Sequence, residues 1–229
     1  TLEISQLDYF FSPNLNFTAL SPQTKHILTI HDLSFALFPK CYSWKRRLWH
    51  RVLQPKKQCE QAHIILTPSE NTKRDVVEIF GIDEKKIKVV RAGLNDELKM
   101  MNDELRAREV REKYKLPERF ILFLGTIEPR KNIVGVIEAY KKYFRKQKYP
   151  VSLVIAGPRG WRDRNIVRAI KNTPGAQYIG FVDPKDKPAL YAMARIFVYP
   201  SLYEGFGFPV LEAFAAGTPV VTSNRSSLP

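Results

Sequence analysis

Short apolar runs alternate with longer amphipathic stretches along most of this 229-residue chain, and this rhythm constrains the fold more than any other feature. In the second half, apolar runs such as FILFL at 120–124 predict buried strands, and the stretches between them predict helices. The expected strands are 120–124, 151–156, 177–181, 196–199 and 219–222, and the expected helices are 132–147, 163–171, 187–194 and 209–216. Five strands with helices between them predict an α/β fold with a Rossmann-type half.

The first half repeats this rhythm less regularly, with expected strands at 26–30, 63–67 and 86–90. Between the last two, Ser69 is a good N-cap and Gly81 suits the left-handed position after a helix end, so a helix is expected between them. A polar helical stretch at 103–115 ends at Leu116-Pro117, where we place a boundary between domains 1–116 and 117–229. The first half has too few strands for a complete Rossmann unit, and the last strand lacks a closing helix. We therefore expect a fragment that lacks an N-terminal βαβ piece and a C-terminal tail.

The net charge of +14 is concentrated in residues 119–229, which have 17 basic and 7 acidic residues against 20 and 16 in residues 1–118. Such an excess points to anionic partners, whether nucleic acid, acidic lipid or a phosphorylated small molecule. No apolar run approaches the ~20 residues that span a bilayer. The first residues do not read as a secretory signal, and Cys41 and Cys59 have neither a disulfide-framework nor a zinc-type spacing. We expect a reducing, cytoplasmic setting.

A glycine-rich turn, Glu204-Gly205-Phe206-Gly207-Phe208, follows the expected strand at 196–199 and precedes a helix that opens at Pro209. Proline is tolerated at the first helical position, because the N–H group that it lacks would have no partner within the helix. The free N–H groups at a helix start that follows flexible glycines form an anion site. Glu204 and Glu212 are placed to accept hydrogen bonds from vicinal hydroxyls of a ligand whose phosphate rests at the helix start. The alternative is a packing turn with two solvated glutamates.

A second strand-to-helix junction, LGTIEPRKN at 124–132, carries the adjacent cations Arg130 and Lys131. Arginine binds a diphosphate through paired contacts and lysine as a point charge, whereas the alternative is a solvated basic loop. Both junctions lie at the carboxyl edge of one expected sheet, which favours the anion-site interpretation. Because the chain has no Asp-x-Asp motif and these cations can take the place of a divalent ion, we expect no metal.

The segment PSLYEGFGFPVLEAFAAGTPVVTSN at 200–224 resembles the Glu-x7-Glu signature of the family-4 retaining glycosyltransferases. The resemblance extends over nearly the whole chain and is stronger in the second half. It implies the GT-B fold, in which two Rossmann-like domains face a cleft, with the N-terminal domain incomplete here. It also implies that Glu212 binds the ribose of the nucleotide, that Glu204 contacts the transferred sugar, and that Arg130 and Lys131 bind the diphosphate. Further donor-binding residues implied by the resemblance are Gly125, Thr126, Gly157, Phe181, Val182, Gly205, Phe206, Gly207 and Phe208.

Two of these positions allow more than one interpretation. Thr126 stands where many members of the family have arginine, so the division of work between Arg130 and Lys131 stays open. Gly157 permits close backbone approach, which suits either a nucleotide or a tight exit from the strand before it.

His31 follows the expected strand at 26–30 and resembles a family histidine that faces the donor sugar. The alternative for a histidine at a strand end is a structural hydrogen bond. Asp32 is equally well explained as a cap for the segment that follows it. The expected catalytic set is His31, Arg130, Lys131 and Glu204.

Residues 44–57, WKRRLWHRVLQPKK, contain six basic residues and no acidic one. On a helix, Trp44, Leu48 and Val52 share one face, with Trp49 and Leu53 beside it. We favour an ordinary helix with a buried apolar stripe and a solvated basic face. The alternative is a helix that lies on an anionic membrane.

Taken with these features, the resemblance implies a metal-independent retaining glycosyltransferase of polysaccharide biosynthesis that needs no cofactor. Its donor is a nucleotide-diphosphate sugar, and its acceptor a glycan or lipid-linked saccharide. The segments TIEPRKN and HDLSF resemble the mannosyltransferase branch of the family, which makes GDP-mannose the expected donor. Peripheral contact with the inner face of the membrane is a further expectation. The alternatives are a nucleotide-sugar epimerase of the same fold and a non-catalytic nucleotide-binding or nucleic-acid-binding fragment. The chain has no recognised nucleic-acid motif, so we expect no nucleic-acid partner.

Overall fold

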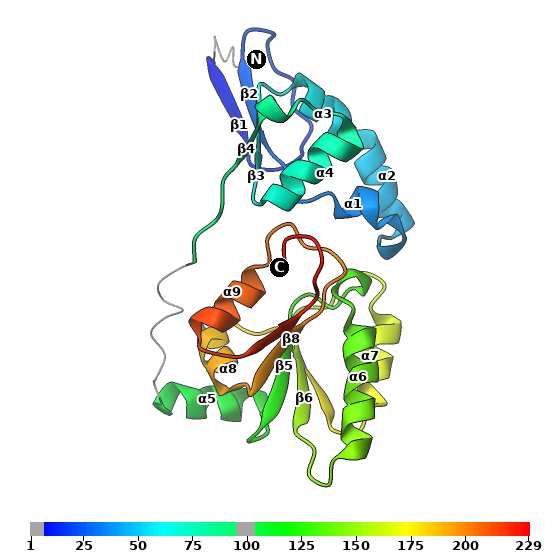
Figure 1. Ribbon diagram of the computed structural model, residues 1–229, viewed down its shortest axis with the longest axis vertical. Coiled ribbons are helices and arrows are strands. Elements are labelled where there is room, and N and C mark those ends of the chain that lie inside the picture. Colours follow the sequence, from blue (N-terminus) through cyan, green and yellow to red (C-terminus); the bar gives the residue numbers. More distant parts are fainter. Residues whose placement is uncertain (1–6, 95–103) are drawn as a thin grey trace. The chain divides into compact units, whose positions relative to one another are not determined.

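The computed structural model describes residues 7–94 and 104–229, which form two α/β units (Figure 1). The first unit runs to Ala92 and includes Glu204–Phe206, and the second comprises Gly93–Tyr203 and Gly207–Pro229. This division differs from the expected ranges 1–116 and 117–229, because the helix α5 (Glu104–Tyr114) packs within the second unit.

The second unit contains the expected five-stranded sheet, and all its strand pairs are parallel. The strands are β5 (Phe120–Leu124), β6 (Ser152–Ala156), β7 (Ala176–Gly180), β8 (Ile196–Tyr199) and β9 (Val220–Thr222), in the spatial order β7-β6-β5-β8-β9. The chain therefore builds outward from β5 in one direction, returns, and builds outward in the other. This is the doubly wound arrangement predicted from the sequence.

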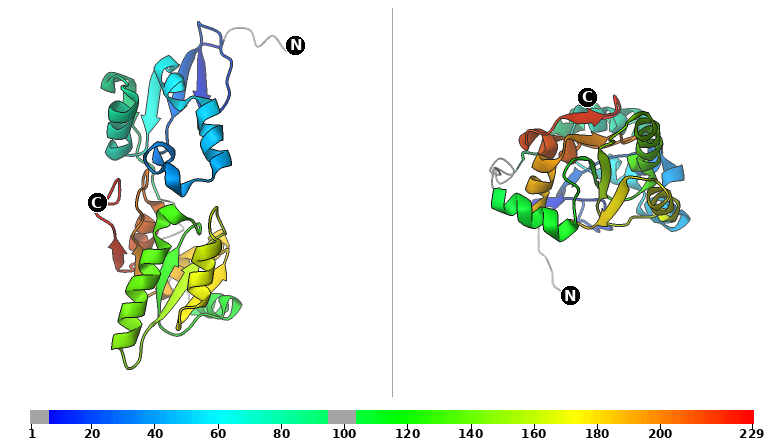
Figure 2. Two further views of the ribbon diagram at one scale, coloured as in Figure 1. Left: turned by 90° about the vertical axis from the view of Figure 1, so that its right-hand side faces the viewer. Right: turned by 90° about the horizontal axis from the view of Figure 1, so that it is seen from below.

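Helices cover both faces of this sheet, as right-handed crossovers between parallel strands require (Figures 1 and 2). α6 (Ile133–Lys146) and α7 (Arg164–Lys171) cover one face, and α5, α8 (Lys187–Met193) and α9 (Phe208–Ala215) the other. The strands between them are apolar on both sides, so Leu122, Phe123, Val154 and Ile155 are fully buried. Helix α6 buries residues at helical spacing, namely Ile133, Val136, Ile137 and Tyr140.

The first unit contains a four-stranded parallel sheet in the order β1-β2-β3-β4. Its strands are β1 (Tyr9–Ser12), β2 (Lys25–Thr29), β3 (Ile64–Thr67) and β4 (Ile87–Val89), and its helices are α1 (Ser34–Leu37), α2 (Trp44–Leu53), α3 (Pro55–Gln61) and α4 (Glu70–Phe80). The expected start and end of α4 are confirmed: the Ser69 hydroxyl accepts from the Thr72 N–H at 3.1 Å, and Gly81 has φ of 69°.

The sequence did not predict β1. Its four residues include exposed Tyr9 and Phe11, and they pair with β2 through the backbone. A four-residue edge strand gives too short an apolar pattern to be distinguished from a loop. None of the described helices has the length and apolar character needed to cross a membrane.

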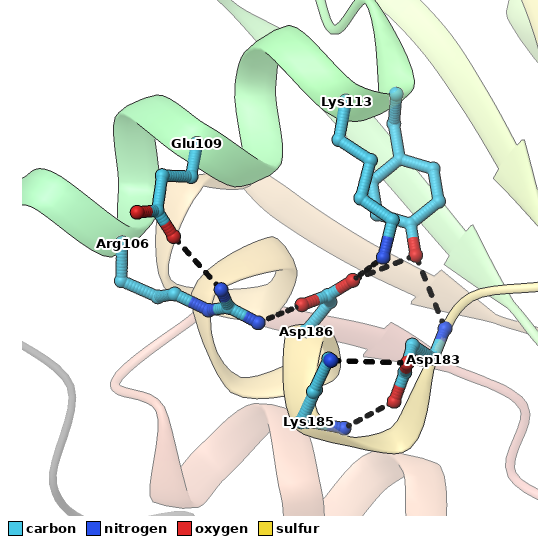
Figure 3. Close-up of polar contacts among 7 residues, drawn as sticks. Arg106, Glu109, Lys113, Asp183, Lys185 and Asp186 are labelled. Atoms are coloured by element: carbon cyan, nitrogen blue, oxygen red, sulfur yellow. Dashed lines mark hydrogen bonds and ion pairs between the residues drawn. The ribbon is translucent and has the colours of Figure 1, made fainter.

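A buried carboxylate fastens α5 to the second unit (Figure 3). Asp186, in a short 3-10 turn before α8, has a fully buried side chain that accepts from Lys113 Nζ at 2.6 Å and the Tyr114 hydroxyl at 2.8 Å, and it pairs with Arg106. Burial by itself raises the pKa of Asp186, but the bonds from Lys113 and Tyr114 and the charge of Arg106 lower it below its usual value. All three partners come from α5, so this carboxylate determines where the helix lies.

Replacing the buried carboxylate, Asp186→Asn, is expected to destabilise the second unit by about 2–3 kcal/mol at pH 7, since the cations of α5 lose their partner. The matched control Glu109→Gln removes a 54% exposed carboxylate from the same Arg106 and is expected to cost under about 0.5 kcal/mol. Denaturant unfolding of both variants measures the difference.

The pH dependence provides a second readout of the same carboxylate. Because the pKa of Asp186 is lower in the folded state, its contribution to stability is present above the unfolded carboxyl pKa of about 3.9 and is lost as the pH falls below it. The difference in stability between wild type and Asp186→Asn should therefore shrink below pH 4. A difference that stays constant down to pH 2.5 would contradict this assignment.

Candidate functional site

The strand order of the second unit reverses between β5 and β8, and the loops after these two strands carry most of the predicted site residues. In open α/β sheets, ligands bind outside the carboxyl ends of the strands at such a switch point, because the loops there lead to opposite faces and leave a crevice. The loop after β5 contains Arg130 and Lys131, and the loop after β8 leads to Gly207 and the start of α9. The topology thus brings together two segments about 75 residues apart, as the sequence predicted.

Lys131 is held at this switch point by an aromatic side chain from the neighbouring strand. Its ammonium donates to the Tyr199 hydroxyl at 2.6 Å and lies 5.0 Å from the centre of that ring. Tyr199 ends β8, is 1% exposed and stacks on Phe123 of β5 and Phe197 of β8. Lys131 itself is only 8% exposed, so the solvated-loop interpretation is wrong for this residue. A largely desolvated cation beside a helix start is a strong attractor for a phosphate.

Arg130 is also fixed, but by a different set of partners. Its guanidinium pairs with the Glu128 carboxylate at 2.8 Å and donates to the Tyr203 carbonyl at 2.6 Å, and its own carbonyl accepts from the Leu202 N–H. Glu128 is almost completely buried. These bonds join the loop after β5 to the loop after β8, and Glu128 offsets the charge of Arg130. Both cations of this loop are thus held in place by residues of the second unit.

Helix α9 begins at Phe208 with Gly207 as its N-cap, in a left-handed conformation of φ 104°. The helix dipole places partial positive charge at this end, as the sequence analysis expected. One turn further, Glu212 is half-buried and accepts from the Tyr191 hydroxyl of α8 at 2.7 Å. Tyr191 is fully buried, and its pKa is raised well above the usual value first by burial and then by the Glu212 charge. Tyr191 thus stays a neutral donor that orients the Glu212 carboxylate.

Ser201, two residues after β8, is another buried polar group in this loop. Its side chain is fully buried, and its hydroxyl oxygen finds no hydrogen-bond partner among the residues that the structure describes. Its carbonyl accepts from the Ser223 hydroxyl at 2.6 Å, which holds the loop against the segment after β9.

Glycines bring three adjacent strand ends close together at the carboxyl edge. The Gly125 N–H donates to Ala156 at 3.0 Å, and the Gly157 N–H donates to Gly180 at 2.7 Å. Gly157 has φ of 131°, and a Cβ placed on it would lie 2.0 Å from the Gly125 carbonyl oxygen. The requirement for glycine at 157 is therefore explained by the strand exit itself, which is one of the two interpretations the sequence left open.

The remaining donor-side residues lie on the same edge of the second unit. Thr126 is partly exposed beside Gly160, where a Cβ would lie 2.8 Å from the threonine methyl group. Phe181 is 65% exposed directly after β7, whereas the Val182 side chain is 2% exposed and belongs to the core. Any contact of Val182 with a ligand must therefore use its backbone. Among the described residues, no group of three or more His, Cys, Asp or Glu side chains is placed to hold a metal ion.

Glu204, Gly205 and Phe206 group with the first unit. The Gly205 carbonyl accepts from the Ser69 hydroxyl at 2.7 Å and the Thr72 hydroxyl at 3.2 Å, both at the start of α4. A Cβ on Gly205 would lie 2.0 Å from the His31 carbonyl oxygen, so only glycine fits this approach.

His31 follows β2 and is exposed, and its Nε2 donates to the Pro13 carbonyl at 2.9 Å. This bond is the structural role considered from the sequence, and the catalytic role stays a prediction. The Asp32 carboxylate accepts from the Ser34 N–H at 2.8 Å and from the Ser34 hydroxyl. Asp32 therefore fixes the turn into α1, in line with a local capping role.

Three supporting residues were missed by the sequence analysis: Tyr199, which holds Lys131; Tyr191, which holds Glu212; and Glu128, which holds Arg130. Glu128 had a detectable signal, since an acid two residues before an arginine in a short loop is a natural partner. The tyrosines lie in apolar stretches, where a single hydroxyl gives no pattern that distinguishes it from core packing.

The chain has two α/β units, each with an all-parallel sheet, and the second carries basic and glycine-rich loops at its switch point. This architecture defines a protein of the GT-B class. Two family models match the chain: "Glycosyl transferases group 1" over residues 106–229 and "Glycosyltransferase Family 4" over residues 6–98. Because the first model covers more than half of the chain, the chain belongs to the group 1 glycosyl transferase family. The resemblance to family 4 inferred from residues 200–224 is confirmed.

The most similar relatives include O-antigen chain mannosyltransferase B of Escherichia coli, which is 34% identical over 207 residues covering 89% of this chain and 54% of that protein. The serotype-specific mannosyltransferase WbdA of Escherichia coli is 31% identical over 212 residues, covering 90% of this chain and 26% of that protein. The chain thus spans about half the length of the first relative and a quarter of the second.

Solved structures share the fold at lower sequence identity. WaaG, a glycosyltransferase involved in lipopolysaccharide biosynthesis, superposes with a TM-score of 0.72 at 17% identity over 97% of this chain and 61% of WaaG. Anabaena HepE, solved in complex with UDP and glucose, gives a TM-score of 0.70 at 18% identity over 90% of this chain and 54% of HepE. These likenesses confirm the predicted fold class.

The close approach at Gly157 predicts that Gly157→Ala destabilises the second unit by roughly 3 kcal/mol or more, since it adds a steric clash to a strained backbone. Gly180→Ala is the matched control. Gly180 also has a positive φ, of 77°, but a Cβ there meets nothing within 4 Å, so only the backbone strain of about 1 kcal/mol is expected. Denaturant unfolding compares the two, and equal losses would show that the contact with Gly125 does not matter.

Proposed function

We propose that the protein is a retaining glycosyltransferase that moves a sugar from a nucleotide-diphosphate donor to a glycan or lipid-linked acceptor. The observation that carries this proposal is that the loops after the two central strands β5 and β8 carry the buried Lys131 and the start of α9, with the oriented Glu212 carboxylate one turn into that helix. A cation and a helix start suit a diphosphate, and a fixed carboxylate one turn away suits ribose hydroxyls. Membership of a glycosyl transferase family supports the same conclusion.

In this proposal the second unit stabilises the leaving group. Departure of a nucleoside diphosphate develops negative charge, which preorganised cations and helix dipoles stabilise without reorganising. Lys131, held by Tyr199, and Arg130, held by Glu128 and the Tyr203 carbonyl, are proposed to provide the positive charge. With these cations at the diphosphate, the reaction is proposed to need no metal ion.

Retention of anomeric configuration is carried over from the family resemblance. The acceptor hydroxyl is proposed to attack on the face from which the diphosphate leaves, without a covalent enzyme intermediate. Glu204 and His31 are proposed to contact the transferred sugar, and Phe181 and the Val182 backbone to contact the base. We assign no general base.

Mannose is the proposed sugar and GDP-mannose the proposed donor, since a relative at 34% identity is named an O-antigen chain mannosyltransferase and one at 31% identity a serotype-specific mannosyltransferase. The name of the first relative supports a polysaccharide acceptor, and a cytoplasmic location is proposed from the sequence alone. An epimerase of the same fold is not favoured, because these relatives are transferases.

Calorimetric titration with GDP, UDP and ADP tests the nucleotide site. Micromolar binding of GDP, unchanged by EDTA, is expected, and Glu212→Gln should weaken it roughly tenfold to a hundredfold, the value of a hydrogen bond to a charged group. The control Glu138→Gln changes an exposed glutamate of α6 and should leave the affinity unaltered. A folded sample that binds none of the three nucleotides would overturn the proposal, and a strict need for a divalent ion would overturn its metal independence.

The supporting role of Tyr191 is tested separately with Tyr191→Phe, which keeps the ring and removes the donor to Glu212. The expected result is a roughly fivefold loss of GDP affinity, about one hydrogen bond. Tyr140→Phe is the control, since the Tyr140 hydroxyl donates to the Val151 and Gly175 carbonyls and has no contact with Glu212 in the described residues. It should lower stability but leave the affinity unchanged; an equal loss of affinity in both variants would contradict the assignment.

A further inference from the structure

Helix α2 leaves its apolar face uncovered, contrary to the buried stripe favoured from the sequence. Trp44, Leu48 and Val52 are 69%, 49% and 53% exposed, and Trp49 is 51% exposed. Of the ten residues of α2, only Leu53 is buried. The sequence interpretation was wrong because spacing shows which residues share a face but not whether that face points inward.

A different side of α2 fastens it to the first unit. His50 stacks on Phe35 with ring centres 4.3 Å apart and meets Tyr42 edge-on at 5.9 Å, and Leu53 is buried beside it. At about 100° per residue, Trp44, Leu48 and Val52 span about 80° of the helix, roughly opposite this buried side. The exposed stripe is thus directed away from the unit's own core, and rotating the helix to bury it would expose His50 and Leu53.

Cations flank the exposed stripe on both sides. On the helical wheel, Arg47 and Arg51 lie along one edge of the stripe and Lys45 along the other, where its ammonium is 5.7 Å from the centre of the Trp44 ring. Lys56 and Lys57, both exposed, continue the basic surface onto α3. Residues 44–57 contain no acidic residue, and Lys56 pairs with Glu60 of α3 at 3.9 Å.

The apolar surface extends beyond the helix. Phe17, 60% exposed in the segment between β1 and β2, meets the Trp49 ring edge-on at 5.4 Å. Phe17, Val52 and the exposed cation Lys57 also line a recess of about 630 Å³. We call Phe17 and the four exposed apolar residues of α2, with Lys45, Arg47 and Arg51, the α2 face.

We infer that the α2 face binds the surface of an anionic phospholipid bilayer, with α2 lying in the plane of the interface. Amphipathic helices with tryptophan on the apolar face and lysine or arginine beside it bind in this way, since the rings enter the headgroup region while the cations meet lipid phosphates. The exposed cations Lys45, Arg47 and Arg51 beside two exposed indoles favour this occupant over a protein surface. The inference goes beyond the proposed function and does not depend on it, since no residue of the α2 face belongs to the site of the second unit.

Vesicle flotation of the whole chain tests the inference. Binding is expected to vesicles of 70% phosphatidylcholine and 30% phosphatidylglycerol, to weaken with salt, and to be absent with phosphatidylcholine alone. Trp44→Ser is expected to weaken binding roughly fivefold or more, and the triple change of Lys45, Arg47 and Arg51 to Gln roughly tenfold or more. These side chains are exposed, so circular dichroism should show that the variants remain folded.

Matched controls come from the second unit. Tyr149→Ser removes an 82% exposed aromatic ring, and the triple change of Lys142, Arg145 and Lys146 to Gln removes three exposed cations near it. Both control variants should bind vesicles like the wild type. If the test and control variants lose vesicle binding to the same extent, binding is non-specific adsorption by net charge, and the inference is overturned.

Bilayer insertion provides a second readout that adsorption alone does not give. Brominated phosphatidylcholine in the anionic vesicles should quench the tryptophan emission of the wild type. When Trp44 and Trp49 are both changed to Phe, the emission that remains should be quenched less. Absence of quenching would show that the indoles do not enter the bilayer. Dimers in light scattering that become monomers in Trp44→Ser would show that the α2 face binds a second copy of the chain instead. Either result would overturn the inference while leaving nucleotide binding, measured without lipid, unaffected.

Discussion

The reversal of strand order between β5 and β8 is the constraint on which the candidate site depends. A parallel sheet that builds outward in both directions from its centre must send the two central loops to opposite faces, so their first residues border one crevice. In this chain those loops carry Arg130, Lys131 and the start of α9. The position of the site is therefore a consequence of topology, and its chemistry is a consequence of the residues in two short loops.

Tyrosines buried in the second unit convert this crevice from a charged surface into an oriented site. Tyr199 fixes the ammonium of Lys131, and Tyr191 fixes the carboxylate of Glu212. Each hydroxyl belongs to a ring that is packed in the core, so the packing of the core limits the movement of the charged group that it contacts. Burial keeps Tyr191 neutral, which leaves it a donor to an anion rather than a competing charge.

The two units treat their charges differently. In the second unit, Asp186 binds three polar side chains of α5, and Glu128 forms an ion pair with Arg130. These charged residues therefore interact with one another within the unit. In the first, the cations of α2 have no acidic neighbour within residues 44–57 and stand beside exposed tryptophans. A net charge of +14 therefore describes two different surfaces, one that organises a site and one suited to an anionic partner outside the protein.

The sequence by itself determined the strand and helix alternation of the second unit, its Rossmann-type class and the two loops that carry the candidate site. These follow from local patterns: apolar runs, helix caps, glycines and adjacent cations. Only the tertiary structure decided that Tyr191 and Tyr199 hold the charged residues, that α5 packs within the second unit, and that the apolar stripe of α2 faces outward. Periodicity fixes which residues share a face, but burial depends on which elements the rest of the chain places against that face, and no local pattern contains that information.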